Sequence, residues 1–101
     1  MSVQTFSSSA LKRDGYAFID CMGKKCGPCK QIAPTIAKLA KKYPDVAFYQ
    51  MDCAEFEKYA DKWEIQSLPT FLFMKDGEEI YRMEGVTDST EEELKKVLKS
   101  L

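Results

Sequence analysis

The sequence predicts an α/β fold, a central mixed β-sheet flanked by helices, with the element order β-α-β-α-β-α-β-β-α. Short apolar runs of strand length alternate with segments whose apolar residues recur at helical spacing. Near the end, an Asp-Gly turn joins two β-rich runs and predicts an antiparallel hairpin, which makes the sheet mixed. Because 101 residues suit one domain and no linker-like stretch divides them, we expect a single domain over residues 1–101.

The first segments combine a weak strand with a strong one. Val3 to Phe6 is interpreted as a short strand, and Ser7 to Lys12 as a short helix with Ser7 as its N-cap. Tyr16 to Met22 is an almost continuous apolar run, typical of a strand buried on both faces of a parallel sheet. Asp20 interrupts this run, and a charged residue in such a strand needs a physical explanation.

The strongest helix is predicted from Pro28 to Tyr43, with Pro34 inside it. Its apolar residues fall on one helical face, while most of its lysines lie away from that face. Val46 to Met51 is interpreted as another buried strand, and Ala54 to Trp63 as a shorter helix. The apolar face of the strong helix consists of Ile32, Ile36, Leu39 and Tyr43.

Two strands and a helix complete the chain. Thr70 to Met74 and Glu79 to Met83 are predicted to form the hairpin, with residues 75–78 as its turn. Thr90 and Glu93 have the spacing of a capping box and predict where the last helix begins. The apolar stripe of that helix consists of Leu94, Val97, Leu98 and Leu101.

Composition and charge exclude several classes of protein. Lys and Arg total 15 and Asp and Glu total 16, so the net charge of −1 gives no field that would attract nucleic acid or membrane surfaces. No apolar run approaches the ~20 residues that span a bilayer, and the N-terminus lacks the pattern of a signal peptide. We therefore expect a cytoplasmic protein with no nucleic-acid or membrane partner.

The chemistry is expected at Cys26-Gly27-Pro28-Cys29, between a buried strand and the strong helix. Free N–H groups and the helix dipole at this end favour an anion, which predicts that Cys26 is the nucleophilic thiolate. Cys29 lies one helical turn further on, where it can close a reversible disulfide as the resolving thiol. Gly27 leaves the attacking sulfur unshielded, and Pro28 presets the first helical dihedral angle.

The four cysteines allow other interpretations. Zinc needs two more ligands, but the chain has no histidine, and Cys21 and Cys53 form no second CxxC, so no metal site is predicted. A purely structural pair of buried thiols is the alternative to redox chemistry. Cys21 and Cys53 are interpreted as small packing residues, with a regulatory second disulfide as the alternative.

A set of landmarks extends over nearly the entire sequence; they are Phe18-Ile19-Asp20, Cys26-Gly27-Pro28-Cys29-Lys30, Ile32-Ala33-Pro34, Asp52, Leu68-Pro69-Thr70 and Asp76-Gly77. In their order and spacing the sequence resembles the thioredoxin family. The resemblance implies a thioredoxin fold and a protein dithiol–disulfide oxidoreductase that carries electrons to target disulfides and maintains cell redox homeostasis. The alternatives are a thioredoxin-like binding or scaffold module with little turnover, and an oxidant or isomerase, against which the missing export signal argues.

The resemblance also implies roles outside the CxxC motif. Asp20 matches a buried family aspartate whose elevated pKa would let it accept a proton from Cys29; a purely hydrogen-bonding carboxylate is the alternative. Leu68 and Pro69 match the substrate-binding segment, in which the proline is cis. The implied partners are an NADPH-dependent thioredoxin reductase and disulfide-containing substrates such as peroxiredoxin or ribonucleotide reductase. This chain, expected to be a monomer, would need no cofactor of its own.

The sequence departs from the family pattern beside the first cysteine. Most relatives have tryptophan there, whereas this chain has Lys25, preceded by Lys24. The change removes a flat apolar surface and adds ammonium groups that could stabilise the thiolate, so we expect altered partner choice; an exposed solubilising lysine is the alternative. The lysine that often lies near the buried aspartate has no clear match, because Ala33 and Phe48 occupy those places.

Overall fold

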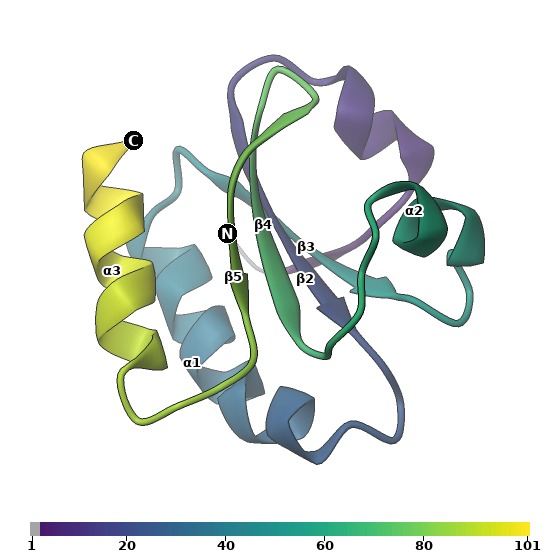
Figure 1. The fold of residues 1–101 in the computed structure, drawn as a ribbon. Coiled ribbons are helices and arrows are strands. Elements are labelled where there is room, and N and C mark those ends of the chain that lie inside the picture. Colours follow the sequence, from purple (N-terminus) through teal and green to yellow (C-terminus); the bar gives the residue numbers. More distant parts are fainter. Residues whose placement is uncertain (1–2) are drawn as a thin grey trace.

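A computed structural model describes residues 3–101, and within them it contains a five-stranded sheet of order β1-β3-β2-β4-β5 (Figure 1). β2 pairs in parallel with β3 and antiparallel with β4, so the predicted mixed sheet is confirmed. The elements are β1 (Gln4–Thr5), the 3₁₀ helix η1 (Ser8–Lys12), β2 (Tyr16–Met22), α1 (Gly27–Lys42), β3 (Ala47–Asp52), α2 (Glu57–Lys62), β4 (Thr70–Lys75), β5 (Glu78–Glu84) and α3 (Thr90–Ser100).

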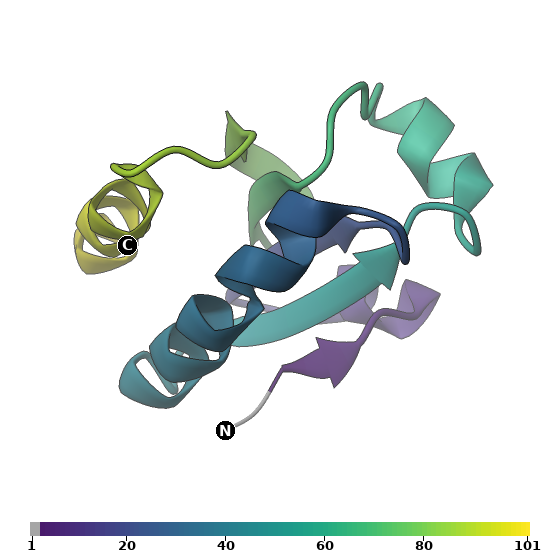
Figure 2. The ribbon, with the colours of Figure 1, turned by 90° about the horizontal axis from the view of Figure 1, so that it is seen from below.

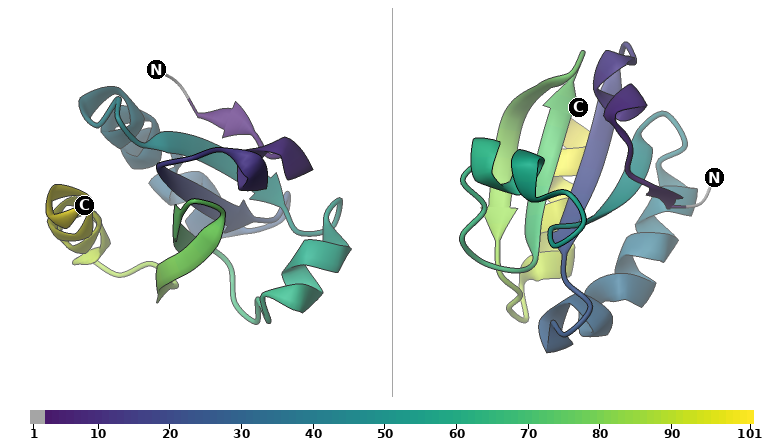
Figure 3. Two further views of the ribbon diagram at one scale, coloured as in Figure 1. Left: turned by 90° about the horizontal axis from the view of Figure 1, so that it is seen from above. Right: turned by 90° about the vertical axis from the view of Figure 1, so that its right-hand side faces the viewer.

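The helices cover both faces of the sheet: α1 and α3 lie on one side, and η1 and α2 on the other (Figures 2 and 3). On the α1 side, the aromatic rings of Phe18, Phe48, Phe71 and Phe73 pack against the apolar stripes of α1 and α3. On the other side, Phe6 forms edge-on contacts with aromatic rings of and around α2. Both faces of β2 are therefore buried, as its sequence predicted.

Alternation along β2 decides which side chains face which helix. Ala17, Ile19 and Cys21 belong to the cluster on the η1 and α2 side, whereas Phe18 belongs to the cluster under α1. Because residues i and i+2 of a strand share a face, Asp20 lies on the α1 side. The carboxyl end of β2 leads directly into the loop before α1.

The hairpin confirms the turn chemistry expected from Asp76 and Gly77. Both have positive φ, 51° and 84°, which two-residue turns between twisted strands require. A Cβ on residue 77 would collide with the main-chain oxygen of Leu11, so glycine is needed there for space as well as for φ. The Gly15 N–H donates to Asp76 Oδ1 at 2.7 Å, which fixes the turn against the start of β2.

Three local predictions were wrong in detail. The predicted short helix is present as a 3₁₀ helix with Ser7 at its N-cap position, but the Ser7 hydroxyl bonds the Ser9 hydroxyl at 2.7 Å and makes no capping hydrogen bond. α2 begins at Glu57, later than expected, because Asp52 first holds a turn. The capping box is absent, since Thr90 is the first residue of α3 and its hydroxyl accepts from the Thr87 N–H at 2.8 Å.

Among residues 3–101, none of the helices has the length and apolarity that a bilayer crossing requires.

Candidate active site

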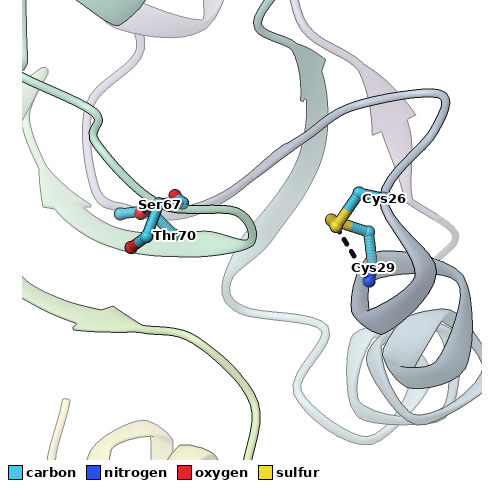
Figure 4. The surroundings of a disulfide bond; sticks show 4 residues. All are labelled: Cys26, Cys29, Ser67 and Thr70. Carbon is cyan, nitrogen blue, oxygen red and sulfur yellow. Dashed lines mark hydrogen bonds between the residues drawn. A yellow bond between two sulfur atoms is a disulfide. The ribbon is translucent and has the colours of Figure 1, made fainter.

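Cys26 is the N-cap residue of α1 and forms a disulfide with Cys29 (Figure 4). Their Cα atoms are 5.3 Å apart, and the Cys29 N–H donates to Cys26 Sγ at 3.2 Å. Cys26 is half-buried, whereas Cys29 is only 4% exposed. The more accessible sulfur is thus the one that occupies the helix cap.

The spacer residues suit the beginning of a helix. Pro28 lies in the first turn, where no main-chain donor is needed, and Gly27 is exposed. A Cβ on Gly27 would meet no atom within 4 Å, so packing does not demand glycine there. The free N–H groups of this 16-residue helix and its dipole favour negative charge on a Cys26 thiolate.

Asp20 is the buried carboxyl group of β2, the strand whose end leads into the loop before α1. Its side chain is 2% exposed, and Oδ1 has no hydrogen-bond partner among the residues that the structure describes. Burial penalises the charged form and raises the pKa of this carboxyl to about 7. At neutral pH the group is therefore close to half protonated and able to take up or release a proton.

The loop before β4 contains the cis peptide bond Leu68–Pro69, so the cis-proline expectation is confirmed. The buried Thr70 hydroxyl donates to the Ser67 carbonyl at 2.7 Å, and the Gly85 N–H donates to the Pro69 carbonyl at 2.9 Å. Figure 4 shows Ser67 and Thr70 on the segment opposite the disulfide. These two hydrogen bonds were not predicted from the sequence, because they depend on the folded conformation of the loop.

A shallow groove joins the disulfide to this loop, and Leu68, Cys26 and Lys25 all line it. Leu68 is 37% exposed and packs over Gly23, where a Cβ would come within 3.0 Å of its Cδ1. Lys24 and Lys25 are both exposed. Lys24 Nζ lies 3.8 Å from Glu55 Oε1, whereas within residues 3–101 no ion pair involves Lys25.

The other two cysteines do not join this site. Cys21 is fully buried on the opposite face of β2, and Cys53 follows β3 and packs against the same cluster. Across the described residues, no group of three or more histidine, cysteine or acidic side chains is placed to hold a metal ion. The candidate site is therefore the dithiol at the start of α1, with the buried Asp20 of β2 and the Leu68–Pro69 loop before β4 as its candidate further members.

A disulfide-forming cysteine pair at the start of a helix on this sheet defines the class of dithiol–disulfide oxidoreductases. Residues 1–100 match the family model described as Thioredoxin. Thioredoxin-2 of Saccharomyces cerevisiae is 40% identical over 84 residues, which are 83% of this chain and 81% of the yeast protein. The chain belongs to the thioredoxin family, and it is a thiol–disulfide oxidoreductase with a redox-active Cys26–Cys29 pair.

Solved structures of family members have the same fold. A thioredoxin of Nicotiana alata matches with a TM-score of 0.86 and 31% identity, over 98% of this chain and 91% of that one. Oxidised mitochondrial thioredoxin 3 of Saccharomyces cerevisiae matches with a TM-score of 0.87 and 31% identity, over 98% of this chain and 95% of that one. The predicted thioredoxin fold is confirmed.

Proposed function

We propose that Cys26 is the attacking thiol and Cys29 the resolving thiol of this protein-disulfide reductase. The supporting observation is the asymmetry of the pair: Cys26 is the more accessible, caps α1 and accepts the Cys29 N–H, while Cys29 is buried. The Cys26 thiolate attacks a target disulfide and releases one target sulfur as a thiolate, which leaves a mixed disulfide. The Cys29 thiolate then attacks the Cys26 sulfur, so the target leaves with two electrons and the Cys26–Cys29 disulfide closes.

Asp20 is the proposed proton acceptor for Cys29 in the resolving step. The Cys29 thiol must lose a proton before it attacks, and a base is most effective when its pKa lies near the working pH. Burial brings the pKa of Asp20 to about 7, and the side chain lies on the face of β2 that α1 covers. These two properties favour proton transfer over a carboxylate that serves only local hydrogen bonding.

The substrate is proposed to bind along the groove beside Cys26. Leu68 offers an exposed apolar side chain, and Pro69 lies in the adjoining loop, whose main chain could pair with an extended target segment. Gly27 has no side chain that could shield the Cys26 sulfur, and Pro28 restricts the backbone of the first turn of α1. Lys25 places an ammonium group where most relatives have an indole ring, which favours the thiolate and a different set of partners.

The partners and cellular location are proposed from the family. We expect an NADPH-dependent thioredoxin reductase to restore the dithiol, and peroxiredoxin or ribonucleotide reductase to be among the substrates. One similar structure, matching with a TM-score of 0.87, concerns the thiol resolving mechanism of yeast mitochondrial 1-Cys peroxiredoxin via glutathione/thioredoxin systems. We propose a cytoplasmic, monomeric electron carrier whose 101 residues form one domain; mitochondrial relatives make the location a point to test.

Trapping the intermediate tests the assignment of the two thiols. Cys29→Ser should attack a disulfide substrate such as insulin but fail to resolve it, so a mixed disulfide through Cys26 accumulates on non-reducing gels. Cys26→Ser, the matched control, should trap nothing and reduce no insulin. Trapping by Cys26→Ser, or turnover by Cys29→Ser at the parental rate, would contradict the proposed roles.

A further inference from the structure

The two remaining cysteines lie side by side on the face of the sheet that faces away from α1. In the parallel register of β2 and β3, Cys21 is opposite Met51. Cys53, two residues beyond Met51, points to the same face, and both cysteines contact the same apolar cluster. The Cys53 N–H donates to the Met22 carbonyl at 3.0 Å, so strand pairing continues to Cys53.

The two thiols are in contact and are chemically unequal. The Cys21 thiol hydrogen-bonds the Cys53 sulfur, which lowers the pKa of Cys53 and raises that of Cys21. Burial by itself raises the pKa of both thiols, and the carboxylates of Asp52 and Asp20 also act to raise that of Cys53. The hydrogen bond from Cys21 outweighs these effects, so the pKa of Cys53 is lowered overall. Cys53 is also the half-exposed member, whereas Cys21 is completely buried.

This inequality is the arrangement of a peroxide-sensitive pair. An oxidant must reach a partly exposed thiolate, and a second thiol in contact with it must be ready to condense with the product. Cys53 is the accessible thiol, and its lowered pKa favours the thiolate that the first condition requires; Cys21 is the second thiol. Two buried packing residues would need neither the contact between their sulfurs nor the accessibility of one of them.

We propose that Cys21 and Cys53 form a second redox pair that hydrogen peroxide converts to a disulfide independently of Cys26 and Cys29. The Cys53 sulfur attacks one peroxide oxygen, the O–O bond breaks, and the sulfur becomes a sulfenic acid while the other oxygen leaves as water after protonation. The Cys21 sulfur then attacks the Cys53 sulfur and expels the sulfenic oxygen as a second water. Two thiols and one peroxide thus yield one disulfide and two waters.

The position of the pair gives this disulfide a structural consequence. It would link β2 to the turn that follows β3, and the residues on either side of Cys53, Asp52 and Ala54, line the groove beside Cys26. One wall of that groove would then be tied covalently to the central strand.

A variant with Cys26→Ser and Cys29→Ser isolates the pair, because Cys21 and Cys53 are then its only cysteines. Treated with hydrogen peroxide as a monomer at low concentration, it should lose both free thiols and the mass of two hydrogen atoms. Digestion should yield a peptide that joins residues 21 and 53, and dithiothreitol should restore both thiols.

Single replacements in this background test the roles. Cys53→Ala should leave Cys21 unoxidised at the same peroxide dose, and Cys21→Ala should halt at a Cys53 sulfenic acid that dimedone labels. Circular dichroism checks that each variant is folded. If Cys21→Ala unfolds, the test rests on two proteins: the variant that keeps both Cys21 and Cys53, and the same variant with Cys53→Ala. Survival of both thiols, oxidation of Cys53 without loss of Cys21, or disulfides only between chains would overturn the proposal.

Discussion

Replacing Asp20 by asparagine should stabilise the oxidised protein, by an amount that grows as the pH rises. Burial raises the pKa of the folded-state carboxyl from its ordinary value of 3.8 to about 7. Below the ordinary value the carboxyl is protonated in both the folded and the unfolded chain, so it imposes no charge penalty. Between the two values the unfolded chain releases a proton that the folded chain retains, so the penalty grows with pH and is complete above the folded pKa.

The magnitude follows from the same pair of values. The gap between 3.8 and about 7, at about 1.4 kcal/mol per pH unit, corresponds to about 4 kcal/mol of destabilisation at alkaline pH. This is a large part of the 5–15 kcal/mol or so by which domains are typically stable. Asparagine keeps the shape but cannot ionise, so the variant avoids the penalty.

Urea unfolding of the oxidised protein at pH values from about 4 to 9 measures the effect. Wild type and Asp20→Asn should nearly coincide at the acidic end and diverge most strongly between about pH 5 and 7. Asp61→Asn, which removes an exposed carboxylate from α2, controls for the loss of a negative charge. A stability difference that does not change with pH, or a variant less stable than wild type at pH 8, would refute a buried carboxylate titrating near neutrality.

Three further outcomes are expected. In single-turnover reduction of a disulfide peptide, Asp20→Asn should slow release from the mixed disulfide on the order of 10²-fold at neutral pH, and an unchanged pH–rate profile would remove the proton-transfer role. Lys25→Trp should lower the thiolate fraction of Cys26, measured by the rate of iodoacetamide alkylation, and alter the kinetics with thioredoxin reductase. Lys30→Trp is the matched control. A Lys25→Trp variant that equals the parent in both assays counts against a role of Lys25 in thiolate stability and partner choice. Gly77→Ala should destabilise the fold by about 1–3 kcal/mol in urea, because its φ is positive and Leu11 occupies the Cβ position, whereas Gly27→Ala should change stability by less than about 1 kcal/mol.

Elements with strong local patterns were predictable to within a residue or two. The bounds of β2 agree with its apolar run, and α1 begins one residue before the predicted start, because periodicity and burial act along the whole length of each segment. The start of α2 was not predictable in this way. The Asp52 side chain accepts the Ala54 N–H at 2.9 Å and diverts the chain into a turn before the helix can begin.

In the candidate site, too, contacts between residues close in sequence were predictable, and contacts between distant residues were not. Cys26, Cys29 and the helix start are adjacent in sequence, so spacing alone predicted their contact. The cis bond at Pro69 came only from the family resemblance, since most such bonds in folded proteins are trans. The contact of Cys21 with Cys53 depends on how two strands 32 positions apart in sequence are aligned, and no local pattern encodes that alignment.

Side chains alternate between the two faces of β2, so the carboxyl of Asp20 and the thiol of Cys21 lie on opposite sides of the sheet. Asp20 and Cys21 are consecutive, so one faces α1 and the other faces the cluster around Phe6. A slip of one residue would exchange them: the carboxyl would enter the cluster on the far side, and the thiol would lie beneath α1. The register is fixed from both sides, by Gln50 of β3 and by Phe71 of β4, each opposite Asp20. Pairing with both neighbours therefore decides on which side of the sheet the carboxyl is buried, because only this alignment places Asp20 on the side that α1 covers.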